Sequence, residues 1–149
     1  MVLHLVMPLL LPTYTGNSLD VSAKSPSPRE IKFSTDGTNL YITGSTSTVD
    51  QYKLGSAWDL STATFYRTID IFSQDFVPRG LAFSSDGTKM FVAGAWNKKI
   101  YQYTLSTPWD ISTASYASIF LSYNPPVTDS EIINFGIILT ILKAFSQVR

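Results

Sequence analysis

The stretch PREIKFSTDGT at residues 28–38 is repeated as PRGLAFSSDGT at residues 78–88, and this repetition decides the fold. The offset is fifty residues until one residue is inserted between Gly94 and Ile100, after which it becomes fifty-one. Three further pairs then align: QY at 51–52 with 102–103, WD at 58–59 with 109–110, and STA at 61–63 with 112–114. Because a repeated structural unit tolerates an insertion confined to a turn, the sequence predicts two units of about fifty residues.

Each unit has the pattern of four short β-strands joined by tight turns. The dipeptides Asp36-Gly37 and Asp86-Gly87 are hairpin signals, because aspartate caps a turn through its side chain and glycine accepts a positive φ. We expect the strands of the first unit at 31–34, 39–43, 49–54 and 66–72, and those of the second at 81–84, 89–93, 100–105 and 117–123.

The second strand of each unit is apolar on both faces, as LYI at 40–42 and MFV at 90–92 indicate. A sheet with one solvated face would alternate between apolar and polar residues. Both faces of each sheet are therefore expected to be covered, as they are when blades pack face to face around an axis. The sequence predicts an all-β fold, a partial β-propeller of two four-stranded antiparallel blades plus an extra edge strand. That extra strand is expected because LDV at 19–21 matches IDI at 69–71.

Residues 78–94 closely follow the signature P-x-G-φ-x-F-S-x-D-G-T-x-φ-Y-V-x-G. Residues 28–44 follow it nearly as well, with Glu30 where glycine is usual. The chain thereby resembles the YVTN/NHL-like β-propeller repeat family over about residues 14–123. The ending YTLSTPWDISTA at 103–114 is similar to a variant of long secreted or phage-associated arrays. The resemblance implies that the first strand of each blade lines a central channel, with Lys32 and Ala82 near the axis.

The expected division is an apolar N-terminal segment at 1–13, an outer strand of a preceding blade at 14–27, blade 1 at 28–77, blade 2 at 78–126 and a divergent apolar C-terminal segment at 127–149. Propellers close with about four to eight blades, so two blades leave open faces. Three arrangements stay open: association with copies of the chain, a fragment of a longer array, or terminal segments folded over the open faces. The apolar run at 132–145 is shorter than the roughly 20 residues of a membrane helix, so no membrane span is expected.

The composition restricts the chemistry. Eleven basic and eleven acidic side chains give zero formal net charge, which argues against nucleic acid as a partner. Cysteine is absent and the lone histidine, His4, lies outside the repeat, so a nucleophile–histidine pair and a zinc site are not expected. We expect no catalytic residue, no metal and no cofactor. The aspartates that recur in each blade are interpreted as turn or helix caps: Asp36, Asp86, Asp59 and Asp110.

Five residues are candidate ligand contacts. Arg29 and Arg79 occupy the same position at the start of the innermost strand, where one arginine per blade would form a collar able to bind carboxylate or phosphate. Pairing of each arginine with an acid of its own blade is the alternative. Trp96, with Asn97 and Lys98, lies in the turn that carries the insertion and is suited to stacking on a sugar or a partner protein. Packing of Trp96 against the adjacent blade is the alternative there.

The leading expectation for function is a non-enzymatic propeller-repeat module for binding or scaffolding, extracellular or virion-associated. Its expected partners are a protein, a glycan, neighbouring blades or copies of itself. A glycan-binding module that uses Trp96 is one alternative. A lactonase-like propeller hydrolase is the second.

Overall fold

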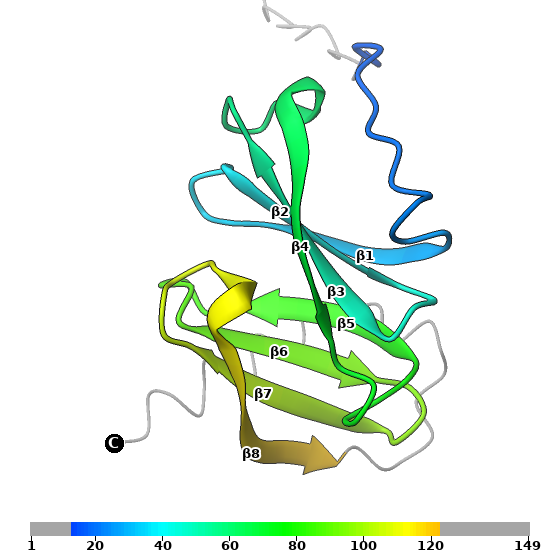
Figure 1. Ribbon diagram of the computed structural model, residues 1–149, viewed down its shortest axis with the longest axis vertical. Coiled ribbons are helices and arrows are strands. Elements are labelled where there is room, and N and C mark those ends of the chain that lie inside the picture. The colour runs from blue at the N-terminus through cyan, green and yellow to red at the C-terminus, as the bar shows by residue number, and fades with distance from the viewer. Residues whose placement is uncertain (1–12, 123–149) are drawn as a thin grey trace, which may run out of the picture.

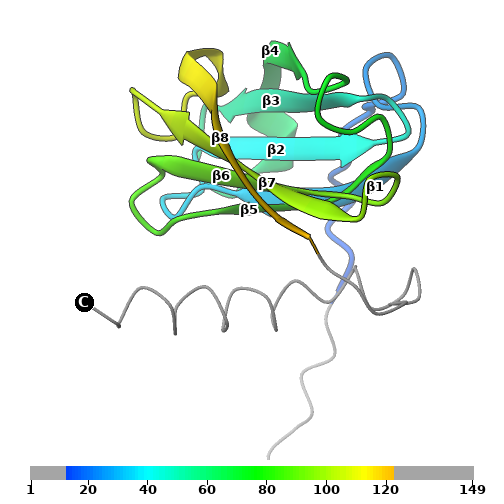
Figure 2. The same ribbon diagram turned by 90° about the horizontal axis from the view of Figure 1, so that it is seen from below.

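The computed structural model describes residues 13–122, which form two four-stranded antiparallel sheets with strands in sequence order (Figure 1). This confirms the all-β fold class with two four-stranded blades. The first sheet contains β1 (Pro28–Phe33), β2 (Asn39–Gly44), β3 (Thr48–Leu54) and β4 (Ala63–Asp70), and the second contains β5 (Pro78–Phe83), β6 (Lys89–Gly94), β7 (Lys99–Leu105) and β8 (Ala114–Ser122). The first strands of the two sheets, β1 and β5, lie side by side (Figures 1 and 2).

The turn between the first two strands of each blade is built in the same way twice. Asp36 Oδ1 accepts a hydrogen bond from the Thr38 N–H at 3.0 Å, and Asp86 Oδ1 accepts one from the Thr88 N–H at 3.0 Å. Both turn glycines are in the left-handed region, with φ of 72° at Gly37 and 71° at Gly87. The capping role predicted for these aspartates is confirmed.

The tryptophan of each blade covers this turn. A Cβ added at Gly37 would lie 2.3 Å from the Trp58 ring, and one at Gly87 would lie 2.4 Å from the Trp109 ring. The turn glycines are therefore required both by backbone conformation and by the close approach of an indole. Both tryptophans adopt a positive φ, 64° and 63°.

A short 3₁₀ helix follows each tryptophan: η1 (Leu60–Thr62) and η2 (Ile111–Thr113). Asp59 Oδ1 accepts from the Ser61 N–H at 3.0 Å, and Asp110 Oδ1 accepts from the Ser112 N–H at 2.9 Å, which confirms both as caps. The fourth strands begin at Ala63 and Ala114, three residues before the predicted starts, because these alanines already pair with Leu54 and Leu105. The Ser- and Thr-rich sequence there concealed the strand starts.

The main core lies between the two sheets. Tyr41 and Val49 of the first sheet pack in one buried cluster with residues of the second sheet such as Met90 and Val92. The Tyr41 and Phe83 ring centroids are 4.3 Å apart across the seam. The opposite face of the first sheet buries Leu40, Ile42, Tyr52 and Leu54, against which Leu19 and Val21 pack. Both apolar faces of β2 are therefore buried, as predicted.

Residues 13–27 differ from the predicted edge strand. No strand is assigned there, because neither described sheet offers residues 14–18 a further strand to pair with. The rest of the segment does copy the link between the blades: Ser22 N–H bonds Asp20 Oδ1 at 2.9 Å as Phe72 N–H bonds Asp70 Oδ1 at 2.7 Å. Leu19 and Val21 accordingly cover blade 1 as Ile69 and Ile71 cover blade 2.

Several expectations concern residues outside the described range. These are the segments at 1–12 and 123–149, which include His4, the end of blade 2 and the apolar run at 132–145. Within residues 13–122 there is no helix of the length and apolarity that crossing a membrane requires.

Candidate functional site between the blades

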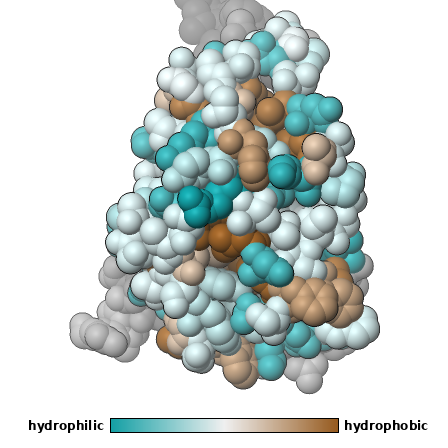
Figure 3. Space-filling view, in the orientation of Figure 1, coloured by the Kyte–Doolittle hydropathy of each residue, from teal (hydrophilic) through white to brown (hydrophobic). Residues whose placement is uncertain are grey.

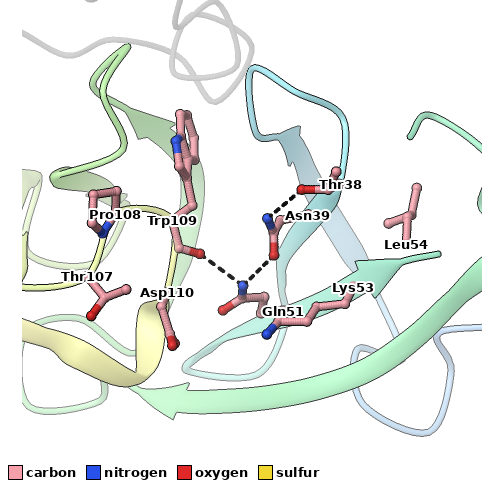
Figure 4. Close-up of a pocket in the computed structure, with 9 residues that line it drawn as sticks. All are labelled: Thr38, Asn39, Gln51, Lys53, Leu54, Thr107, Pro108, Trp109 and Asp110. Atoms are coloured by element: carbon pink, nitrogen blue, oxygen red, sulfur yellow. Dashed lines mark hydrogen bonds between the residues drawn. The ribbon is translucent and has the colours of Figure 1, made fainter. Parts of the chain in front are cut away.

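A cavity of about 340 Å³ opens at the seam between the two sheets (Figure 4). One wall comes from the start of β2 and the end of β3, and the other from the turn that precedes η2. The lining residues are Thr38, Asn39, Gln51, Lys53, Leu54, Thr107, Pro108, Trp109 and Asp110. The site is thus assembled from both blades and lies at the end of the strands that carries the Asp-Gly and Trp-Asp turns.

Gln51 fixes the floor of this cavity. Its side chain is 1% exposed, and its amide nitrogen donates to the Trp109 carbonyl at 2.9 Å and to Asn39 Oδ1 at 2.8 Å. Its Oε1 accepts from the buried Ile111 N–H at 3.1 Å. Every polar atom of this buried amide is paired, and two of the three bonds cross the seam. Figure 4 shows the amide between Asn39 and Trp109.

Tyr41 adds a second polar link across the seam, because its hydroxyl donates to the Trp109 carbonyl. Burial, with the nearby negative charges of Asp36 and Asp110, raises the pKa of the Tyr41 phenol. The phenol therefore remains a neutral donor at physiological pH. Gln51 and Tyr41 together hold the Trp109–Ile111 turn against the first sheet, so the two walls of the cavity are rigidly placed.

The charged groups of the cavity come from opposite blades. Lys53 lines the cavity from β3, and Asp110, which precedes η2, lines it from the other wall (Figure 4). The Lys53 Nζ lies 3.7 Å from the centroid of the Tyr66 ring. Partial burial raises the pKa of the Asp110 carboxyl. Hydrogen bonds from Ser112 and the positive charges of Arg67 and Lys53 more than offset this, so its pKa lies below the usual range. Asp110 is therefore an anion at neutral pH, and the charges of two cations of the other blade act on it.

The residues predicted as ligand contacts lie elsewhere. Arg29 is exposed on β1 and Arg79 is half-buried on β5, each one residue after the start of its strand. Trp96, Asn97 and Lys98 lie in the β6–β7 turn, at the opposite end of the strands from the cavity. Because Pro78 pairs with Gly94, Arg79 is at the same end of its sheet as this turn.

The sequence did not point to the cavity. Asp110 was interpreted only as a cap, and the repeat of Gln51 as Gln102 was the one signal of an internal polar position. Lys53 has no counterpart, because Thr104 stands at the matching place in blade 2. In the described part of the chain, no group of three or more His, Cys, Asp or Glu residues lies close enough to hold a metal ion.

Comparisons with known proteins give the fold. No protein-family model matches the chain, and no curated protein is similar to it. Among solved structures, it is similar to a putative 6-phosphogluconolactonase from Bacteroides fragilis, with a TM-score of 0.52 and 19% sequence identity. The alignment covers 67% of this chain and 27% of that protein. At this identity the likeness establishes the fold alone. It nevertheless contradicts the expectation that the chain is not an enzyme, since the protein that shares its fold bears the name of a lactone hydrolase.

Proposed function

We propose that this chain supplies two neighbouring blades of a lactonase-like propeller of the YVTN/NHL-like repeat class, and that the seam cavity binds a sugar lactone. The observation that carries the proposal is a polar cavity with a carboxylate and an ammonium on facing walls. Its volume of about 340 Å³ is at the small end of ligand sites and suits one sugar ring. The similarity to a putative 6-phosphogluconolactonase supports the choice of substrate class.

The chemistry needs few groups. In lactone hydrolysis, water adds to the ring carbonyl, the ring C–O bond breaks, and a hydroxy acid is released. Asp110, as an anion, is placed to accept the proton of the attacking water. Lys53 Nζ lies 3.7 Å from the centroid of the Tyr66 ring, and rotation of the lysine side chain would bring it to the carbonyl oxygen, where it stabilises the developing negative charge. A lactone is an activated ester, so a carboxylate of low basicity is sufficient.

The charge around the cavity favours an anionic substrate. Lys53 and Arg67 both act on Asp110, and both come from the first blade. A phosphate on the sugar would therefore be attracted by the positive charge that the first blade brings to this side of the cavity. We expect a phosphorylated lactone to bind more tightly than the neutral sugar lactone.

The test is hydrolysis of 6-phosphoglucono-δ-lactone by the full chain, followed as acid release above the spontaneous rate. Asp110→Asn should lower the rate of enzymatic hydrolysis about a hundredfold, because the general base is lost. Lys53→Thr introduces the residue found at position 104 and is expected to weaken binding of the phosphorylated lactone. Binding of the product, 6-phosphogluconate, is measured in parallel by NMR line broadening.

Asp59→Asn is the matched control. Asp59 caps η1 as Asp110 caps η2 but does not line the cavity, so its replacement should leave hydrolysis unchanged. The proposal is rejected if the folded chain neither accelerates hydrolysis nor binds the product. It is rejected equally if Asp59→Asn and Asp110→Asn have the same effect.

A further inference from the structure

Each sheet keeps one face, its outer face, turned away from the other sheet (Figure 1). On the first sheet this face exposes side chains whose repeat counterparts in the second sheet are covered. Ile31 is 55% exposed, whereas Leu81 is 0% exposed in the core at the seam. Trp58 is 59% exposed, whereas Trp109 is half-buried. The outer face of the first sheet is therefore a copy of a surface that a neighbouring blade covers in the second sheet.

The aromatic rings of the exposed surface have the same arrangement as those of the covered one. The ring centroids of Phe33 and Trp58 are 5.2 Å apart, and those of Phe83 and Trp109 are 5.4 Å apart. At the seam, Tyr41 of the first blade packs on the second of these pairs, with its ring centroid 4.3 Å from that of Phe83. A ring from a further blade would find Phe33 and Trp58 already placed for the same contact.

The hydrogen-bonding groups of the two surfaces also correspond. At the seam, the Gln51 side chain donates to the Trp109 carbonyl at 2.9 Å and accepts from the Ile111 N–H at 3.1 Å. The counterparts on the outer face of the first sheet are the Trp58 carbonyl and the Leu60 N–H. Neither of them makes a hydrogen bond within the described part of the chain. An acceptor and a donor in the same arrangement are thus available there.

The chain itself carries the surface that fits, on the outer face of the second sheet. Gln102 is the repeat counterpart of Gln51, and it pairs with Phe91 on β6 as Gln51 pairs with Tyr41 on β2. Phe91 and Gln102 are both half-buried. Among the residues that the structure describes, the Gln102 side chain has no hydrogen-bond partner. The outer face of the second sheet therefore presents an aromatic ring and an amide where the first sheet presents Tyr41 and Gln51 at the seam.

Charge complementarity favours contact between these two outer faces. Asn39 and Asp110 line the seam cavity from opposite walls. Their repeat counterparts are Lys89 and Asp59, which lie on the second and the first blade. Contact of the two outer faces in the geometry of the seam would bring this lysine and this aspartate to opposite walls of an equivalent cavity. The two charges then attract each other.

The rim of the blades offers no comparable surface. The outer strands β4 and β8 lie in front in Figure 1, and Figure 3 views the molecule from this side. The brown side chains there form separate groups among hydrophilic ones. Contact through the sheet faces is therefore favoured over contact through the rim.

We propose that the outer face of the second sheet in one copy of the chain packs on the outer face of the first sheet in another copy, in the geometry of the seam. Phe91 then contacts Phe33 and Trp58, and Gln102 bonds the Trp58 carbonyl and the Leu60 N–H. Because two different faces meet, each added copy presents a further free face, and association continues until a ring closes. Propellers close with about four to eight blades, which corresponds to about two to four copies of a chain with two blades.

Residues 13–18 have to move when a second copy binds. Asn17 is the repeat counterpart of Arg67 in β4, so this segment lies where the outermost strand of the arriving blade would be placed. All six residues are exposed, and the Asn17 amide donates to Asp59 Oδ1 over a long 3.3 Å. Moving the segment is therefore inexpensive, but it weakens association. We expect a dissociation constant on the order of 10 μM, so that dilute samples contain single chains.

The experiment measures the mass of the full chain in solution by light scattering after size exclusion, over a range of concentrations. We expect 16.5 kDa in dilute samples and two to four times this mass in concentrated ones. Ile31→Glu alters the outer face of the first sheet, and Gln102→Glu alters that of the second. Because Ile31 is exposed and glutamate has the shape of glutamine, both variants should fold, which circular dichroism checks. Each should raise the dissociation constant at least about tenfold.

Mixing the two variants tests the polarity of the contact. The Ile31→Glu chain keeps an intact second sheet and the Gln102→Glu chain an intact first sheet, so the mixture should form pairs of two chains although neither variant assembles alone. Phe72→Glu is the control, because Phe72 is 66% exposed in the β4–β5 link and lies on neither outer face. It should assemble like the parent chain.

Three results would overturn the proposal: single chains at every concentration, assembly that persists in both face variants, or a mixture of the variants that forms no pairs. The seam cavity lies within one chain, so hydrolysis of 6-phosphoglucono-δ-lactone should be the same in Ile31→Glu as in the parent chain. The outcome for assembly is thus independent of the proposed lactonase activity.

Discussion

Replacing Gln51 by leucine should separate the polar link between the blades from simple packing. Leucine retains most of the volume but cannot accept the hydrogen bond from the Ile111 N–H or donate to the Trp109 carbonyl. A buried N–H left without a partner costs about 1–3 kcal/mol, and each net hydrogen bond lost costs about 1 kcal/mol. Allowing for the gain from a more apolar side chain, we expect a loss of about 3 kcal/mol in the free energy of unfolding. For a chain of this size, that corresponds to a fall in Tm of about 10 °C.

The assay is urea unfolding followed by circular dichroism, with Gln102→Leu as the matched control. Gln102 is the repeat equivalent of Gln51 and is half-buried, on the face of β7 opposite to Tyr101 and Tyr103, which pack toward the first blade. Its replacement should change stability by less than about 1 kcal/mol. Equal losses in the two variants, or a loss below about 1 kcal/mol in Gln51→Leu, would refute the role assigned to Gln51.

Three further predictions follow from the turns and from buried charge. Gly87→Ala should lower the free energy of unfolding, measured by thermal unfolding, by about 2–4 kcal/mol, because φ is 71° and the new Cβ would lie 2.4 Å from the Trp109 ring. Gly55→Ala is the control and should leave stability almost unchanged, because the nearest atom to its new Cβ lies at 3.5 Å. Hydrogen bonds from Ser84 and Thr88 lower the pKa of Asp86 from 3.8 to about 2, so the stability it adds is present above pH 3.8 and is lost as the pH falls toward 2. The stability difference between the parent chain and Asp86→Asn, measured in urea, should shrink over that interval and stay constant at higher pH. Burial raises the pKa of Asp50, against the opposing effects of the Thr68 hydroxyl and Lys24, so its ionisation above that pKa opposes folding. Asp50→Asn should therefore stabilise the protein at neutral pH and lose this advantage in acid; destabilisation at neutral pH would contradict the assignment.

The repeat made the fold predictable, because local signals agreed with one another in both units. Asp-Gly turns, doubly apolar second strands and Trp-Asp caps each specify a local structure, and each appears in the expected place. The starts of β4 and β8 were missed, since both strands begin with an alanine, which has weak strand preference, and pairing with β3 and β7 decides its conformation. The expected strand at 14–27 failed for a related reason: its sequence resembles an outer strand, but a strand forms only beside a partner.

The candidate site was much less predictable than the fold. Lys53 and Asp110 are 57 positions apart in the sequence and line one cavity only because one blade packs on the next. Repeat symmetry also concealed Asp110, because its capping bond is identical to that of Asp59 and offers a sufficient structural explanation. Trp96 stood out in the sequence through the insertion, whereas Phe76, whose ring centroid is 4.5 Å from that of Trp96, is brought beside it only by the folded β4–β5 link.

The central claim is that the two sheets pack as consecutive blades with the Tyr41 face of the first against the second. Aromatic proton NOEs in an NMR spectrum of the chain test this directly. The claim predicts strong cross-peaks between Tyr41 and Phe83, whose ring centroids are 4.3 Å apart, and weaker ones between Tyr41 and Trp109 at 6.5 Å. Cross-peaks between Phe33 and Trp58, at 5.2 Å within the first blade, serve as the internal reference. A spectrum that contains the reference peaks but none between Tyr41 and Phe83 would contradict the account.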